Sequence, residues 1–189
     1  MPRAAPGLRE ARVPVWFTAD THFGHGALRA LMRRPFATTA AMDAALVEGW
    51  NAAVGPADEV WHLGDFAIGH RDPAGLLESL HGEKHLVWGN NDPPAIRALP
   101  GWVSVQPYVE LEREGQALVL CHYPFRSWNG QGKGAWNLHG HSHGRLKPLA
   151  RQFDVGVDPR GFRPVGLSGL RAAPRGMAGA KPEGTAPDA

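Results

Sequence analysis

Three short apolar segments in the first half of the chain each run into a turn that opens on a polar side chain. The segments 13–18, 59–63 and 84–88 are followed by Asp20, Asp65 and Asn90. Apolar runs of this length, bounded by polar turns, are typical of buried strands. Segments with helical spacing of apolar residues separate them, which predicts a sheet with helices packed against it. Ligand sites in such sheets lie beyond the carboxyl ends of the strands, so these polar residues mark a candidate site.

Capping and turn signals predict most of the remaining elements. A helix is expected over 38–54 with a threonine cap, and Asp72 before Pro73 predicts a capped helix that ends near residue 80. The pair Asp92–Pro93 predicts a further short helix by the same logic, with Asp92 as its cap. Two strand-like runs between 102 and 121, joined at Glu114–Gly115, predict a hairpin. Further strands are expected at 136–139 and 153–157, which together indicate an α/β (α+β) domain with mixed sheets.

The composition is that of one globular domain with short extensions. The chain has 189 residues, of which 43% are hydrophobic and 20% charged, so it is long enough to bury a core. We expect a poorly ordered arm over 1–11 and a folded domain over 12–170. The segment 171–189 is rich in Ala, Pro and Gly, and we expect it to be a disordered tail because it has too little apolar surface to bury.

Charge and cysteine content restrict the partners and the compartment. The net charge is +2 and the basic residues are scattered, which makes stable nucleic-acid binding an unlikely primary role. The single cysteine, Cys121, excludes an intramolecular disulfide. The first residues lack the apolar core of a signal peptide, and the longest apolar runs are too short to cross a bilayer. We therefore expect a cytoplasmic protein without a membrane partner. No motif indicates an oligomeric state.

Five short clusters carry side chains that bind metal ions. Aspartate, histidine and asparagine together suit hard to intermediate cations, and partners two residues apart on an extended segment share one face. Taken singly, each cluster has an ordinary explanation, such as a helix cap, a turn or a solvated loop. Their occurrence in order, each at the end of an expected strand, favours a joint metal site. The clusters are Asp20-Thr-His22, Gly64-Asp65, Gly89-Asn90-Asn91-Asp92, His122 and Gly140-His141-Ser-His143.

This set of clusters resembles the motif set of the calcineurin-like metallophosphoesterase superfamily. The flanking segments 16–25 and 122–128 resemble a small bacterial and phage branch of it. The resemblance spans residues 20–143, most of the expected domain. It implies two mixed β-sheets packed as a sandwich and flanked by helices.

The resemblance also implies two divalent cations. One would be held by Asp20, His22, Asp65 and His143, and the other by Asp65, Asn90, His122 and His141, with Asp65 bridging. Mn²⁺ is the expected metal, although Fe, Zn²⁺ and Ni²⁺ accept the same donors. In the implied reaction a metal-bridging hydroxide attacks phosphorus in line with the leaving group. The chain is thereby expected to be a metal-dependent phosphoric ester hydrolase.

The third cluster departs from the motif of the superfamily. Where the motif has a histidine that contacts the phosphate or protonates the leaving group, this chain has Asn91, which cannot act as a general acid near neutral pH. We therefore expect a bias toward phosphodiesters. Asp92, which normally orients that histidine, is expected to cap the next helix instead. Arg126 and His25 are further candidates for binding the substrate.

Two alternatives stay open at this point. A phosphomonoesterase or protein phosphatase of the same superfamily would use the same ligands, and a non-catalytic metal-binding scaffold would bind metal without turnover. The expected substrate is a small phosphate ester, with nucleotide-derived esters included.

Overall fold

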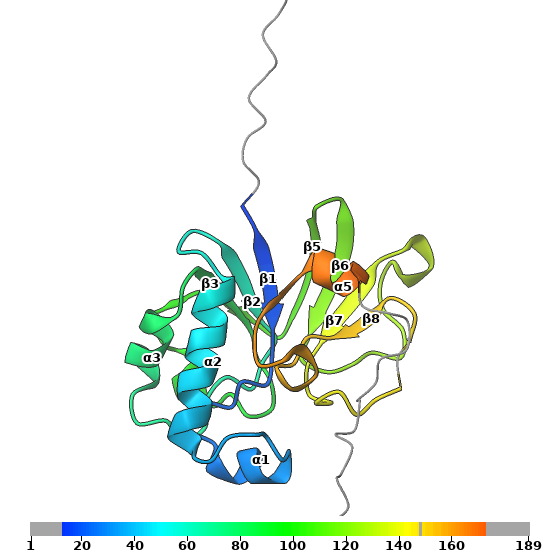
Figure 1. Cartoon of the computed structure of the whole chain (residues 1–189). Coiled ribbons are helices and arrows are strands. Elements are labelled where there is room, and N and C mark those ends of the chain that lie inside the picture. Colours follow the sequence, from blue (N-terminus) through cyan, green and yellow to red (C-terminus); the bar gives the residue numbers. More distant parts are fainter. Residues whose placement is uncertain (1–12, 148, 173–189) are drawn as a thin grey trace, which may run out of the picture.

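The computed structural model describes residues 13–147 and 149–172, which form two β-sheets packed face to face (Figure 1). The first sheet has five strands in the order β4-β3-β2-β1-β9. They are β1 (Val15–Thr18), β2 (Glu59–His62), β3 (Glu83–Val87), β4 (Trp102–Gln106) and β9 (Val165–Gly166). The second sheet has the order β5-β6-β7-β8, formed by β5 (Tyr108–Arg113), β6 (Gln116–Cys121), β7 (Trp136–His139) and β8 (Gln152–Asp154). The expected fold class, two mixed sheets with helices, is confirmed.

Helices cover the outer face of the first sheet, as Figure 1 shows for α2 and α3. The α-helices are α1 (Gly26–Leu31), α2 (Thr39–Ala53), α3 (Pro73–Ser79), α4 (Pro94–Arg97) and α5 (Leu167–Ala172), and two 3₁₀ turns are η1 (Gln131–Lys133) and η2 (Asp158–Arg160). The two main caps are as predicted. Thr38 accepts a hydrogen bond from the Ala41 amide at 3.0 Å, and Asp72 accepts one from the Gly75 amide at 2.9 Å.

One layer of apolar side chains lies on each side of the first sheet. The outer layer packs α2 and α3 against the sheet through Met42, Leu46, Trp50, Leu76 and Leu77. The inner layer lies between the two sheets and includes Phe17, Leu63, Val87, Leu120 and Leu138. The central strands of the first sheet are therefore buried on both faces, as parallel strands usually are.

Parallel pairing brings the carboxyl ends of the central strands to one edge of the first sheet. Thr18 lies opposite His62 in the β1–β2 pair, and His62 lies opposite Leu86 in the β2–β3 pair. The β6–β7 and β7–β8 pairs of the second sheet are also parallel, and His139 lies opposite Asp154. The polar residues that follow these strands are thus placed side by side.

Two sequence-based expectations need correction. The strand-like run expected between 102 and 113 is two strands in different sheets, since Pro107 separates β4 from β5 and has no N–H to continue a ladder. The helix α5 continues through Ala172 and so includes the first two residues of the expected tail. The rest of that tail and the expected arm over 1–11 lie outside the described residues. The predicted hairpin at Glu114–Gly115 is present as β5–β6.

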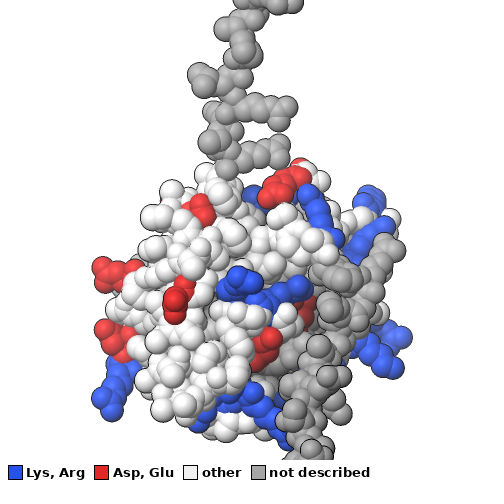
Figure 2. Space-filling view, viewed as in Figure 1, with Lys and Arg blue, Asp and Glu red and all other residues white. Residues whose placement is uncertain are grey.

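Basic and acidic side chains are interspersed on the face drawn in Figure 2. Within the described residues, no helix has the length and apolar character needed to cross a membrane.

Candidate metal centre

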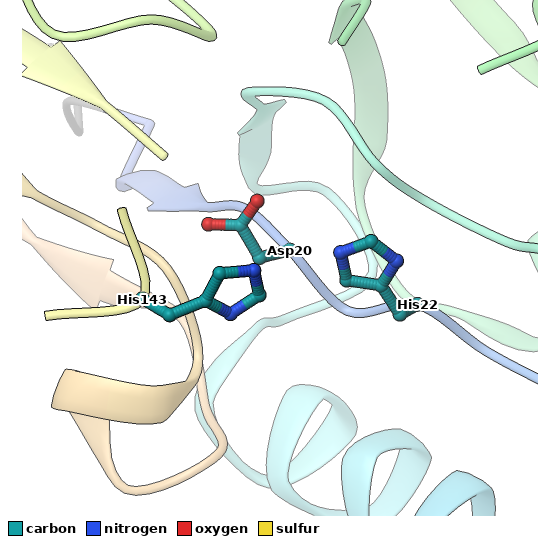
Figure 3. Close-up of side chains that lie close together, drawn as sticks. All are labelled: Asp20, His22 and His143. Carbon is teal, nitrogen blue, oxygen red and sulfur yellow. The ribbon is translucent and has the colours of Figure 1, made fainter. Parts of the chain in front are cut away.

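The candidate ligands meet where strands of both sheets end. Potential ligand atoms of Asp20, His22 and His143 lie within 4.8 Å of one another, and so do those of Asp20, Asp65 and His122. Figure 3 shows the first group, in which Asp20 and His22 come from the segment after β1 and His143 from the segment after β7. Residues far apart in the chain therefore form two adjoining groups, and Asp20 belongs to both.

Asp65 lies between two histidines of these groups. Its Oδ2 is 3.4 Å from Nε2 of His22, and its Oδ1 is 3.6 Å from Nε2 of His122. Each carboxylate oxygen thus faces a different imidazole. This is the arrangement that a carboxylate needs if it is to reach two cations at once.

Hydrogen bonds on the far side of two imidazoles assign their tautomers. Nδ1 of His122 lies 2.8 Å from the Leu63 carbonyl oxygen, and Nδ1 of His143 lies 2.7 Å from Oδ2 of Asp158. Since both partners are acceptors, Nδ1 carries the proton, and the Nε2 lone pair is left to bind a cation. Nε2 of His22 is buried and has no hydrogen-bond partner within the described part of the chain. An orphaned buried nitrogen beside carboxylates fits a metal ligand.

The two asparagines of the third cluster have different contacts. Oδ1 of Asn90 lies 3.1 Å from Nε2 of His122, and because both atoms are acceptors, a shared cation would satisfy them together. Asn91 donates to Asp65 twice, from its backbone amide to Oδ1 at 2.8 Å and from Nδ2 to Oδ2 at 2.7 Å. Asn91 therefore contacts the central carboxylate directly.

The other predicted site residues lie at the margin of the groups. His141 is exposed, its ring packs edge-on against His122 at 5.2 Å, and its backbone amide donates to Asp20 at 2.9 Å. Nδ1 of His25 lies 3.4 Å from Nδ1 of His22. Arg126 is exposed.

Several candidate ligands have a left-handed backbone conformation. This conformation is uncommon for residues other than glycine, and it concentrates at functional sites where surrounding structure imposes it. Nine non-glycine residues in the described ranges have positive φ, and five of them are candidate ligands. These are Asp20 (56°), His22 (50°), Asp65 (60°), His141 (66°) and His143 (49°).

The charges of the site are arranged for a cation. Burial, with the nearby carboxylate of Asp154 next in importance, raises the pKa of Asp20 well above its usual value. Burial and then His143 lower the pKa of His22 to about 2, so this imidazole is neutral near neutral pH. A divalent cation would offset the repulsion between the carboxylates and bind the neutral imidazoles. The donor set therefore fits divalent metal ions.

Asp92 does not cap a helix, which corrects the prediction made from Asp92–Pro93. The helix α4 has Pro93 at its N-cap and no side-chain cap. The Asp92 carboxylate is buried and accepts from the amides of Asp65, Phe66 and Gly89 at 2.7, 2.8 and 2.8 Å. Asp92 therefore ties the turn after β2 to the turn after β3.

Three residues that sequence reasoning missed also support the site. Asp154 accepts from the Ser142 hydroxyl and the Gly144 amide, both at 2.7 Å, and so holds the segment that carries His141 and His143. Asp158 contacts His143 and also pairs with Arg34. Burial would raise the pKa of Asp158, but hydrogen bonds from His143 and Arg34 lower it overall. The signal in the sequence was another strand that ends in an acidic residue, Asp154, with a second acidic residue, Asp158, four positions later.

A buried histidine beside the site gives a prediction about acid stability. Nε2 of His62 bonds to the Thr21 hydroxyl at 2.9 Å, and burial lowers its pKa to about 3. As pH falls below the unfolded pKa of about 6.5, the unfolded chain takes up a proton that the folded chain does not. Between pH 6.5 and about 3, this difference lowers the free energy of unfolding by about 1.4 kcal/mol for each pH unit. We expect the His62→Phe variant to lose less stability over this range, by the same amount per pH unit. Urea unfolding of the metal-free proteins at several pH values measures both slopes, and identical slopes would contradict the assignment.

Comparison with known proteins places the chain in a family. No protein-family model matches it. The Gene 66 protein of Mycobacterium phage D29 is 32% identical over 177 residues, covering 76% of this chain and 87% of the relative. The Gene 66 protein of Mycobacterium phage L5 is 29% identical and covers 77% of this chain and 87% of the relative.

The fold is shared with a protein of known structure. A protein of unknown function from Aquifex aeolicus has a TM-score of 0.71 and 21% identity, over 85% of this chain and 98% of that protein. A phosphoesterase from E. coli has a TM-score of 0.48 and 18% identity, over 76% of this chain and 78% of that protein. The chain shares its fold with the Aquifex aeolicus protein, and it belongs to the family of the mycobacteriophage Gene 66 proteins.

Proposed function

We propose that this chain is a metal-dependent hydrolase of phosphate esters that uses two divalent cations, with Mn²⁺ as the expected metal. The observation that carries the proposal is the position of Asp65, whose two carboxylate oxygens face Nε2 of His22 and Nε2 of His122 at 3.4 and 3.6 Å. The two groups of candidate ligands share Asp20 and therefore adjoin one another, as a two-cation site requires. Bound there, two cations supply a nucleophile at neutral pH and offset charge on the phosphoryl oxygens.

Hydrogen bonds within the chain orient two of the ligand histidines before a cation binds. Hydrogen bonds from Nδ1 of His122 and of His143 direct the Nε2 lone pair of each ring toward the groups. Asp20, His22, Asp65 and His143 would hold one cation. Asp65, Asn90, His122 and His141 would hold the other, with the exposed His141 lying over His122. Little reorganisation of the rings of His122 and His143 is then needed when the cations bind.

The side chain of Asn91 supports a bias toward phosphodiesters. Its amide contacts Asp65 at the centre of the site and can donate hydrogen bonds. An amide does not release a proton near neutral pH, so the leaving group must depart without one from this position. Diesters and activated esters with weakly basic leaving groups meet that requirement better than alkyl monoesters. The proposed substrate is a small phosphate ester, with nucleotide-derived diesters included.

Hydrolysis of two chromogenic esters by metal-stripped protein tests the proposal. The protein is supplied again with Mn²⁺ and given bis(p-nitrophenyl) phosphate or p-nitrophenyl phosphate. We expect turnover that requires Mn²⁺ and favours the diester. Bound Mn²⁺ without turnover of either ester would instead support a non-catalytic scaffold, and a preference for the monoester would support a phosphatase.

Replacement of Asn91 by histidine should shift the preference toward monoesters. A general acid typically contributes about 10²–10⁴-fold to departure of a basic leaving group. We therefore expect Asn91→His to raise the ratio of kcat/KM for an alkyl monoester to that for bis(p-nitrophenyl) phosphate by up to about 10²-fold. The Asn91→Ala variant is the matched control, since it removes the donor to Asp65 without adding an acid. A ratio in Asn91→His no higher than in Asn91→Ala would contradict the role given to position 91.

A further inference from the structure

A buried arginine connects two of the segments that carry candidate ligands. Arg34 lies between α1 and α2, and its side chain has no exposed surface. Its guanidinium donates to the backbone carbonyls of Asp20 and Thr21 at 2.6 and 2.8 Å. It also forms a two-pronged pair with Asp158, from Nε to Oδ1 at 2.9 Å and from Nη2 to Oδ2 at 2.8 Å. Only such a full set of partners offsets the cost of burying the charge.

Asp158 connects Arg34 to a candidate ligand, His143. Its Oδ2, which accepts from Arg34, also accepts from Nδ1 of His143 at 2.7 Å. Arg34 and Asp158 are 124 positions apart in the chain, so the contact exists only in the folded protein. The connected groups run from the backbone of Asp20 and Thr21 through Arg34 and Asp158 to the ring of His143.

The network reaches one of the two ligand sets. His122 is oriented by the Leu63 carbonyl, and Asp65 receives its hydrogen bonds from Asn91. Neither contact involves Arg34 or Asp158. The hydrogen bonds that orient His122 and Asp65 therefore come from residues outside the network of Arg34 and Asp158.

We propose that Arg34 and Asp158 are positioning residues that set the affinity of one cation, the one bound by Asp20, His22 and His143, without changing that of the other. Asp158 keeps the proton of His143 on Nδ1 and so leaves Nε2 free to bind. Arg34 holds Asp158 in place. It also fixes the backbone of Asp20, which has left-handed φ, and of Thr21. This inference rests on the proposed function, because it assumes that both cations bind.

Substitution of Asp158 by asparagine should weaken the binding of one cation and leave the binding of the other unchanged. The amide keeps the shape of the side chain, but its Nδ2 can donate to Nδ1 of His143, which moves the ring proton to Nε2, the atom that must bind the cation. Loss of such an orienting partner typically costs 10–100-fold in metal affinity, so we expect a weakening of about 10–100-fold at one cation only. Arg34→Lys keeps the charge but loses the planar fork, and it should weaken the same cation.

Titration of the metal-stripped full chain with Mn²⁺, with free Mn²⁺ followed by electron paramagnetic resonance, measures the two affinities. Nitrogen-15 NMR of the metal-free protein reports the tautomer of His143, which a purely structural role for Asp158 would leave unchanged. Glu59→Gln is the matched control. The Glu59 side chain is 16% exposed against 15% for Asp158, and it forms a two-pronged pair with Arg113 at the other end of β2. Thermal unfolding verifies that each variant is folded.

Selective weakening of one cation in Asp158→Asn and Arg34→Lys, with both retained in Glu59→Gln, would support the inference. Equal weakening of both cations, or no weakening in either variant, would overturn it while leaving the proposed function intact. If Asp158→Asn does not fold, Arg34→Lys decides the question by the same criterion. An unaltered chain that binds no Mn²⁺ would overturn the proposed function and this inference with it.

Discussion

The Asp65→Asn variant is expected to lose at least about 10²–10³-fold of Mn²⁺-dependent phosphodiester hydrolysis, the scale typical of removing one preorganised electrostatic group. Asp65 is the carboxylate whose two oxygens face His22 and His122, so the change removes charge from both ligand sets at once. The amide has the same shape as the carboxylate, and one of its two polar atoms is a donor that repels a cation. The loss should therefore come from the site rather than from the fold.

Rates with bis(p-nitrophenyl) phosphate at saturating Mn²⁺ measure this effect. Glu59→Gln is again the suitable control, because Glu59 begins the strand β2 and Asp65 follows its end. The same preparation of both variants also excludes a contaminating phosphatase. An Asp65→Asn variant as active as Glu59→Gln would show that Asp65 has no part in the reaction.

The second large effect is expected at Gly64. This residue has φ of 91°, and a Cβ atom there would lie 2.5 Å from the Gly89 amide nitrogen and 2.6 Å from Nδ1 of His122. Left-handed strain costs about 1–2 kcal/mol and overpacking about 1–3 kcal/mol, so Gly64→Ala should lower the free energy of unfolding by about 2–5 kcal/mol. It should also displace His122 and with it the second ligand set. Urea unfolding of the metal-free protein measures the loss.

The Gly115→Ala variant is the control that separates backbone strain from overpacking. Gly115 also has positive φ, of 72°, but a Cβ atom there would meet nothing within 4 Å. Gly115→Ala should therefore cost only the backbone term of about 1–2 kcal/mol. Equal losses in the two variants would mean that the close approach of Gly64 to Gly89 and His122 is not a constraint.

Sequence signals predicted those parts of the molecule whose cause is local. The caps of α2 and α3 were predicted because Thr38 and Asp72 bind amides three residues away. The closeness of the segments that carry Asp20, Asp65 and Asn90 was predicted because parallel strands of one sheet end at a common edge. The roles in catalysis and in metal binding that the resemblance implies for these residues stay predictions.

Contacts between distant segments were not predictable in the same way. Asp92 has the sequence context of a cap, yet its partners include amides 27 and 26 positions earlier in the chain. Arg34 appears in the sequence as one of two adjacent basic residues, and only folding brings Asp158 to it. A helix cap binds residues close to it in the sequence. Asp92 and Arg34 instead bind residues that are distant in the sequence and come close only when the chain folds.

The candidate ligands come from both β-sheets, and under the proposed function this arrangement has a consequence for the distance between the cations. Asp65 and Asn90 follow strands of the first sheet, whereas His122 and His141 follow strands of the second. The sheets are held apart by the side chains between them, among them Leu63, Leu120 and Leu138. Protein interiors are packed too tightly to absorb a change of volume without movement. Under the proposed function the apolar layer would act as a spacer for the metal pair, and a shortened leucine in this layer would slow hydrolysis by changing the gap that the phosphate must bridge.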